Sequence, residues 1–259
     1  MKCVSAVAVL ACTAGSVLAG DISQVNSGVL DLRRFNDFPT SELTVVNDGL
    51  NEISFRETFA AGTVGNFANK HLAYLSTDGS NAFGMSRSQS WMLMMDIRID
   101  APAGSPRKEG AIQIENPRPG LGYTDEGRIL VASDGEVAVF GGVMPFTGLG
   151  NVYTLGTTAH MIFEFFAPGE VDAKGAYRLT FIDAVTGAHS SGLKIWGDET
   201  DGTAGFNEGT RIALVAQNQR NPVIDDSSFI QYSNISIVPA PGALGLIGLM
   251  GLAAARRRR

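Results

Sequence analysis

The chain has almost no cysteine. Only Cys3 and Cys12 occur among its 259 residues, and both lie in an N-terminal segment that we expect to be removed. The remaining chain therefore has no disulfide, no thiol nucleophile and no cysteine ligand for a metal ion. Its stability must come from packing.

Basic residues are scarce between the two ends. Without Lys2 and the four C-terminal arginines, 15 basic residues face 26 acidic ones, a net charge of −11. Nucleic-acid binding needs a basic surface, so this balance argues against nucleic-acid partners.

Between the two ends of the chain, helical periodicity is also missing, apart from a short turn that we expect near Asp31 to Phe38. No repeat of fixed period occurs, which argues against a propeller or solenoid. Period-two alternation dominates instead. From Trp91 to Ile99 every second residue is apolar, and Ser133-Asp134-Gly135 separates two short apolar runs as a hairpin turn would. About eleven such strands predict an all-β, two-sheet antiparallel β-sandwich.

The strand pattern from Glu52 to Val238 resembles the concanavalin A-like lectin/glucanase jelly roll. That resemblance implies one sandwich domain of a type found in many exported bacterial proteins. An immunoglobulin-like sandwich is the alternative, although the segment is long for one.

The N-terminus is typical of a signal peptide. Lys2 precedes an apolar run from Val4 to Leu18, and Val17-Leu18-Ala19 places small or apolar residues at a cleavage site. We expect signal peptidase to cut after Ala19, with Gly20 as the second choice. Acylation of Cys12 as a lipoprotein is a rival interpretation.

The C-terminus has three parts. It begins with Val238, Pro239, Ala240, Pro241 and Gly242, continues with an apolar stretch from Ala243 to Ala255, and ends with Arg256, Arg257, Arg258 and Arg259. We expect a hydrophobic transmembrane helix whose arginines stay cytoplasmic.

This tail is similar to a PEP-CTERM sorting domain in the VPxPGA form of planctomycete-like bacteria, although Ala240 stands where the name-giving motif has glutamate. The resemblance implies that an exosortase-like membrane enzyme recognises the tail, with the chain as its substrate. A retained single-span anchor is the alternative. The expected domains are then the signal peptide (1–19), the sandwich (20–237) and the sorting signal (238–259). The expected location is the cell envelope, or the cell surface or extracellular space after processing.

No catalytic motif stands out. No strand carries the Glu-x-Asp-x-(x)-Glu pattern of glycosidases on the resembled fold, Glu115 being a single strand carboxylate. His71, His160 and His189 lie far apart in the sequence, which gives a zinc site no support. We expect no catalytic residue and no cofactor.

Two weaker candidates for binding remain. Acidic loops containing Asp198, Asp201, Asp225 and Asp226 suit a structural calcium ion, because calcium prefers oxygen ligands. Solvated turns are the plainer interpretation. Polar strand positions at Asp96, Arg98, Gln113, Glu115 and Arg178 suit a carbohydrate-binding face, with Trp196 or Tyr177 as an exposed ring for stacking on a sugar.

We therefore expect a non-enzymatic exported protein with carbohydrate or matrix binding as its candidate role. The alternatives are an extracellular polysaccharide-acting hydrolase with an unrecognised site and a purely structural envelope component. Carboxylates clustered on one concave face would favour the enzyme.

Overall fold

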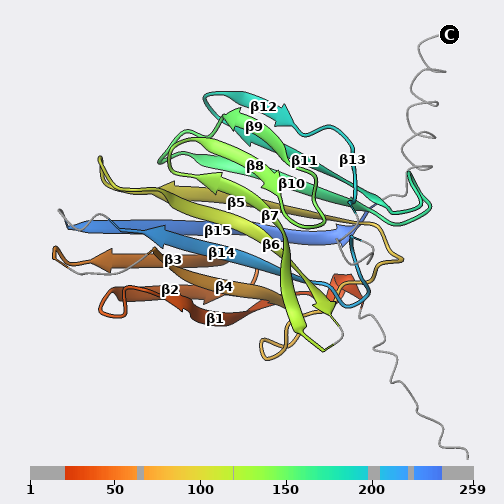
Figure 1. The fold of residues 1–259 in the computed structure, drawn as a ribbon, viewed down its shortest axis with the longest axis horizontal. Coiled ribbons are helices and arrows are strands. Elements are labelled where there is room, and N and C mark those ends of the chain that lie inside the picture. The colour runs from red at the N-terminus through yellow and green to blue at the C-terminus, as the bar shows by residue number, and fades with distance from the viewer. Residues whose placement is uncertain (1–20, 63–66, 119, 198–204, 221–224, 241–259) are drawn as a thin grey trace, which may run out of the picture.

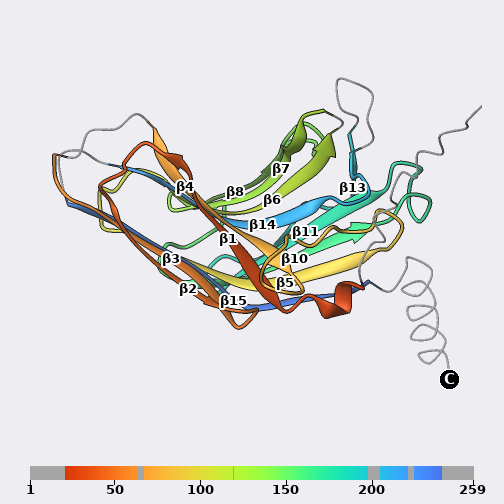
Figure 2. The same cartoon turned by 90° about the horizontal axis from the view of Figure 1, so that it is seen from below.

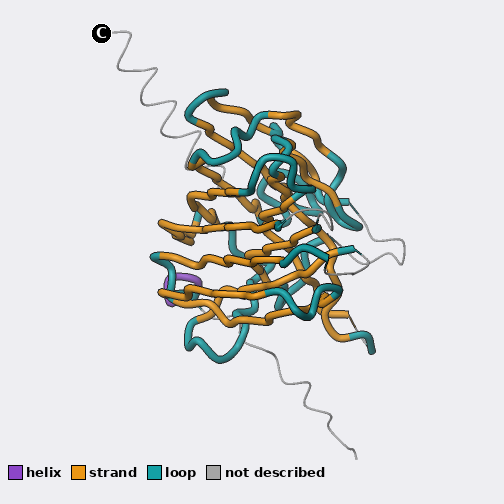
Figure 3. Tube along the Cα trace, turned by 90° about the vertical axis from the view of Figure 1, so that its left-hand side faces the viewer, coloured by secondary structure: helices purple, strands orange, loops and turns teal. Residues whose placement is uncertain are grey.

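The computed structural model describes residues 21–62, 67–118, 120–197, 205–220 and 225–240. They form a sandwich of two antiparallel sheets (Figure 1). Strand dominates the described chain, whose only helix is the short 3₁₀ turn η1, Ile22–Gln24 (Figure 3). The predicted fold class is confirmed.

Sheet A contains seven strands. Their spatial order is β1 (Ser27–Asn36), β4 (Ala68–Ser76), β14 (Arg211–Gln219), β6 (Lys108–Arg118), β7 (Gly122–Ala132), β8 (Glu136–Phe140) and β9 (Thr147–Asn151). In Figure 2 the sheet curves away from its partner at both ends, so its outer face is concave.

Sheet B contains eight strands. Its main order is β12 (Gly187–Ser190), β11 (Ala176–Asp183), β10 (Thr158–Phe166), β5 (Trp91–Asp100), β15 (Asp226–Pro239), β3 (Glu52–Phe59) and β2 (Glu42–Asp48), while β13 (Lys194–Ile195) pairs with β11.

The core between the sheets follows the alternation seen in the sequence. On β5, Trp91 and Ile99 and the three alternate residues between them are at most 1% exposed, which confirms the predicted buried face. The hairpin around Ser133-Asp134-Gly135 is confirmed as well, because β7 and β8 pair across it. Each side chain on the core face removes apolar surface from water, at about 25 cal/mol per Å².

The turn expected near Asp31 to Phe38 is wrong. That segment belongs mostly to β1, which pairs with β4. The pairing shifts register between Asp31 and Phe35, so apolar and polar residues do not alternate regularly there. Such a bulge removes the period-two signal without removing the strand.

Tyr232 ties the two sheets together. From β15 in sheet B its hydroxyl crosses the core, donates to the carbonyl of Val215 at 2.6 Å and accepts from the amide of Ala111 at 2.7 Å. Gly110 makes room for it, because a Cβ there would meet Ile97 at 2.7 Å and the Tyr232 hydroxyl at 3.1 Å. Tyr232 thus anchors sheet A from its core side, opposite the concave face.

A buried polar cluster lies between the sheets, centred on Glu57 of β3. The carboxylate accepts hydrogen bonds from Ser41 Oγ at 2.6 Å, Asn69 Nδ2 at 2.5 Å and Asn218 Nδ2 at 2.8 Å. His71 Nε2 lies 3.2 Å from Oε2, the oxygen that also accepts from Asn218. Burial by itself raises the pKa of Glu57, but these hydrogen bonds, that of His71 first, outweigh burial and lower it.

We expect Glu57→Gln to lower the free energy of unfolding at pH 7 by about 3 kcal/mol, because it replaces a carboxylate oxygen by an NH2 group and leaves buried donors without their acceptor. A carboxyl whose pKa is depressed by folding stabilises the protein above its unfolded pKa of about 4.3 and loses that effect as pH falls further. The difference in the free energy of unfolding between wild type and variant should therefore narrow below about pH 4. Urea unfolding at pH 7 and at pH 3 measures this difference at each pH.

Glu42→Gln, at an exposed position on β2, is the matched control and should change stability by less than about 0.5 kcal/mol at either pH. A gap for Glu57→Gln that is the same at both pH values would contradict the assignment of an ionised Glu57.

Candidate functional site

The outer face of sheet A carries a continuous set of polar side chains from five neighbouring strands. Strand alternation places them opposite the core-facing residues of the same strands. We call this set the concave polar network; its members are Arg34, Lys70, Tyr74, Glu109, Gln113, Glu115, Asp125, Arg128 and Gln217.

Glu115 of β6 is one centre of the network. Tyr74 Oη donates to Glu115 Oε2 at 2.8 Å, and Gln113 Nε2 donates to Oε1 at 2.6 Å. Arg34 Nη2 lies 3.3 Å from Oε1 and donates to Tyr74 Oη at 2.9 Å. Burial, followed by the Glu115 carboxylate, raises the pKa of Tyr74, so its phenol is held protonated.

Asp125 of β7 is the second centre. Its Oδ2 lies 3.3 Å from Lys70 Nζ and 3.1 Å from Arg128 Nη2. The Asp125 side chain is 41% exposed, whereas that of Lys70 is only 4% exposed. Burial, with the nearby charge of Arg128 second, lowers the pKa of Lys70.

The two centres are adjacent. Glu115 pairs directly with Asp125 in the β6–β7 register, just beyond a bulge. Arg128 also connects them, because its Nη2 donates to Gln113 Oε1 at 3.1 Å. Tyr74, a proton donor, and Lys70, an amine of lowered pKa, therefore lie on the same strand, β4. Tyr74 contacts Glu115, and Lys70 contacts the neighbouring Asp125.

A layer of apolar residues supports the network. Leu72, Ala111, Ala213 and Val215 lie on the same face and are at most 1% exposed. The aliphatic stems of long charged residues commonly cover such surface while their charged ends stay polar. The network is thus a partly dry polar site, where hydrogen bonds and charges act more strongly than in water.

The sequence predicted part of this site. Gln113 and Glu115 belong to the concave polar network, as the alternation with Ile112 and Ile114 indicated. Asp96, Arg98 and Arg178 do not, because they lie on sheet B, where they pair with His160, Asp100 and Glu164 in turn.

The aromatic residues proposed for sugar stacking are wrong. Trp196 is 1% exposed and Tyr177 is fully buried, and both pack against each other with ring centroids 5.0 Å apart. The sequence analysis expected these rings to be exposed, but both pack into the core between the sheets.

Lys70, Tyr74 and Arg128 were missed in the sequence. Lys70 and Tyr74 lie on β4, whose residues are all buried, so polar residues such as His71 occur on both of its faces. No alternation is visible in such a strand.

The candidate calcium site has little support among the described residues. Asp226 is buried in an ion pair with Lys108 at 2.6 Å, and Asp225 Oδ1 accepts from the amide of Ala61. Asp198 and Asp201 lie outside the described residues. Within the described ranges no three His, Cys, Asp or Glu side chains gather as metal ligands would.

The three histidines also lie apart. His71 is in the core, His160 lies 2.8 Å from Asp96 on sheet B, and His189 is bonded to Thr186. They share no site.

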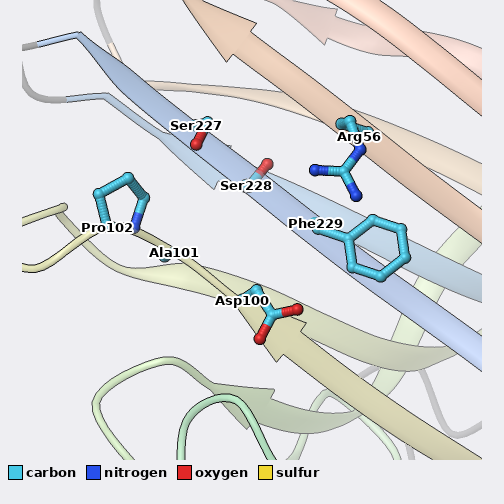
Figure 4. Close-up of a pocket in the computed structure, with 7 residues that line it drawn as sticks. All are labelled: Arg56, Asp100, Ala101, Pro102, Ser227, Ser228 and Phe229. Atoms are coloured by element: carbon cyan, nitrogen blue, oxygen red, sulfur yellow. The ribbon is translucent and has the colours of Figure 1, made fainter.

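A shallow pocket lies on sheet B, lined in part by Arg56, Asp100, Ser227 and Phe229 (Figure 4). The guanidinium of Arg56 covers the Phe229 ring at 4.4 Å from its centroid. The ring is therefore not free to stack on a ligand from that side. The concave polar network is the stronger candidate because it combines carboxylates with a proton donor and a buried amine, which the residues lining this pocket do not.

The structure describes the first three residues of the expected sorting motif. Val238 and Pro239 end β15 and pair with Met92 and Trp91, and the amide of Ala240 donates to the carbonyl of Ser90 at 2.9 Å. The expected signal peptide with Ala19 lies outside the described residues, as do Pro241, Gly242, the expected hydrophobic helix and Arg256 to Arg259. Within the described part of the chain, no helix has the length and apolar character needed to cross a membrane.

Neither a protein-family model nor a curated protein matches the chain. Solved structures do. Alginate lyase A1-II′, a member of polysaccharide lyase family 7, gives a TM-score of 0.52 at 14% identity over 84% of this chain and 96% of that chain. A histidine and tyrosine double variant of the same lyase, in complex with a substrate, gives 0.50 at 14% identity over 84% and 94%. A seed lectin of Lotus tetragonolobus gives 0.44 at 8% identity over 83% and 99%.

The two likenesses with TM-scores of 0.50 and 0.52 show the jelly-roll fold. They also overturn the expectation of a non-enzymatic protein, because the higher-scoring neighbours are enzymes that act on a polysaccharide. Glu109, Glu115 and Asp125 all lie on the concave face, the placement of carboxylates that would favour the polysaccharide-acting alternative.

We expect Asp125→Asn to lower the pKa of Lys70 further. The variant removes the anion that favours the charged amine but keeps the burial and the neighbouring Arg128 that oppose it. Heteronuclear NMR titration of the Lys70 side chain measures the change. Asp134→Asn is the control, because Asp134 pairs with Arg107 instead. An unchanged or raised pKa of Lys70 in Asp125→Asn would contradict the described pairing.

Proposed function

We propose that the chain is an exported polysaccharide lyase whose active site is the concave polar network. The observation that carries the proposal is the hydrogen-bonded group of Tyr74, Glu115, Arg34 and Gln113 beside the Lys70–Asp125–Arg128 group. The structural likeness to family 7 alginate lyases supports it, and it suggests a polymer of uronic acids as the substrate class.

The reaction we infer is a β-elimination. A base removes the proton on the carbon beside the uronate carboxyl group, and the electron pair left behind forms a C=C bond. The C–O bond to the departing sugar breaks, and an acid protonates the leaving oxygen. Atoms balance without water.

The residues divide between the two proton transfers by their shifted pKa values. Lys70, with its lowered pKa, is the candidate base, and Tyr74, with its raised pKa, is the candidate acid. Arg128 would pair with the substrate carboxylate in place of Asp125, which makes the adjacent C–H more acidic. Glu115 orients the Tyr74 hydroxyl.

We also propose a location outside the cell. We infer that the signal peptide directs export and that the tail is recognised by an exosortase-like enzyme, which would place the sandwich at the cell surface or in the extracellular space. Support comes from the sequence of both ends.

We expect Tyr74→Phe to lower kcat on a polyuronate by about 10² to 10⁴, because it removes the proton donor and keeps the ring. The assay follows the ultraviolet absorbance of the new conjugated C=C bond and repeats the digestion in ¹⁸O-labelled water. Tyr123→Phe, at a half-exposed ring near the β6–β7 turn, is the control and should leave kcat nearly unchanged.

A wild-type protein that cleaves the polymer with incorporation of ¹⁸O and without new absorbance would be a hydrolase, and elimination would be wrong. Equal activity of wild type and Tyr74→Phe would remove Tyr74 from the mechanism.

We expect the protein isolated from its native envelope to lack residues 1–19 and the apolar tail. Intact-mass spectrometry measures both ends at once. A mass that retains Arg259 would contradict sorting by cleavage, and one that retains Met1 would contradict export through the signal peptide.

A further inference from the structure

The bulge in β1 is unusually wide. Asp31 pairs with Leu72 and Phe35 with Lys70, so three residues of β1, Leu32 to Arg34, lie opposite one residue of β4, His71. The middle residue of the three, Arg33, has a φ of 60°, in the left-handed region that non-glycine residues seldom adopt. Such a conformation persists only where surrounding contacts hold it.

His71 supplies one of these contacts. The backbone amide of Arg33 donates to His71 Nδ1 at 3.1 Å. A nitrogen that accepts a hydrogen bond carries no proton, so the ring proton lies on Nε2, which faces Glu57 Oε2 at 3.2 Å. The ring is stacked on Phe55 with an interplanar angle of 18°. Its orientation is therefore fixed from three sides.

The Arg33 side chain supplies the others. Its guanidinium turns away from the concave face and donates to the carbonyl of Ser41 at 2.7 Å, to Ser41 Oγ at 3.0 Å and to Asn36 Oδ1 at 2.8 Å. With Arg33 held on that side, the next residue, Arg34, projects onto the concave face, where it meets Tyr74 and Glu115.

We propose that His71 is a positioning residue of the active site, which acts by holding the β1 bulge so that Arg34 reaches Tyr74 and Glu115. His71 itself is fully buried and cannot touch a substrate. The inference rests on the proposed function for its effect on catalysis, but not for its effect on the bulge.

Two isosteric replacements separate the two roles of the ring. In His71→Asn, the amide oxygen can occupy the place of Nδ1 and accept from the Arg33 amide, but nothing reaches Glu57. In His71→Gln, the amide nitrogen can replace Nε2 and donate to Glu57, but nothing accepts from Arg33. Both variants leave a polar group in the same cavity, so loss of stability alone should affect them similarly.

The first measurement is amide hydrogen exchange at Arg33 by NMR, in wild type and both variants. We expect slow exchange in wild type and His71→Asn. We expect exchange at least about tenfold faster in His71→Gln, because an amide that has lost its acceptor is less protected from exchange. Equal exchange in the two variants would overturn the proposal. Because this measurement needs no activity, it tests the bulge even if the chain proves not to be a lyase.

The second measurement is a double-mutant cycle with Arg34→Gln, read as kcat/KM on a polyuronate. If His71 acts through Arg34, His71→Gln should cost at least about tenfold in wild type and nothing more in the Arg34→Gln background, because coupled sites are not additive. His71→Asn should retain most of the activity. Additive losses would overturn the positioning role, whereas an inactive wild type with the expected exchange pattern would overturn only the proposed function.

Discussion

The structure depends on one constraint, the burial of β4 on both of its faces. Successive side chains of a strand point to opposite sides, so Asn69 and His71 enter the core while Lys70 and Tyr74 enter the concave face. A slip of one residue would exchange the two sets. It would bring the lysine against Glu57 and the histidine against Asp125, and both polar clusters would lose their partners. The core cluster and the candidate active site are therefore held in place by the same strand register.

On the proposed function, an acidic protein presents a site for an acidic polymer, and the local charges of the concave polar network allow this. The chain outside its two ends carries a net charge of −11, which by itself repels a polyuronate. Exposed charges farther than about 8 Å away are largely screened at physiological salt, so the local set decides. In the concave polar network, Arg34, Lys70 and Arg128 balance Glu109, Glu115 and Asp125. Lys70 and Arg128 share the most exposed of those carboxylates, and the apolar layer beneath them strengthens their attraction for an anion.

The sequence predicted those strands in which apolar and polar residues alternate. From Trp91 to Ile99 the alternation was visible and correct. The same signal identified Gln113 and Glu115 on β6, which is largely buried on both faces but keeps polar and apolar residues in alternation. It failed at β4, where polar residues follow one another from Asn69 to His71, and at β1, where the bulge at Arg33 interrupts the period. The glycosidase pattern places carboxylates on a single strand. The candidate site instead joins side chains from β1, β4, β14, β6 and β7, and no linear pattern records which strands become neighbours.

The three carboxylates of the network differ in how readily a ligand could replace them. The Glu115 side chain is 3% exposed and fixed by Tyr74 and Gln113, so moving it would leave a buried charge without partners. Glu109 is 12% exposed and held by Arg107 and Gln217. Asp125 is 41% exposed and, on the proposed function, can turn into water while a substrate carboxylate takes its place beside Arg128. That exchange keeps Arg128 paired and removes from Lys70 the anion that favours its charged form, whereas a neutral sugar offers no anion to replace Asp125. Preference for uronates over neutral glycans then follows from the exposure of a single side chain.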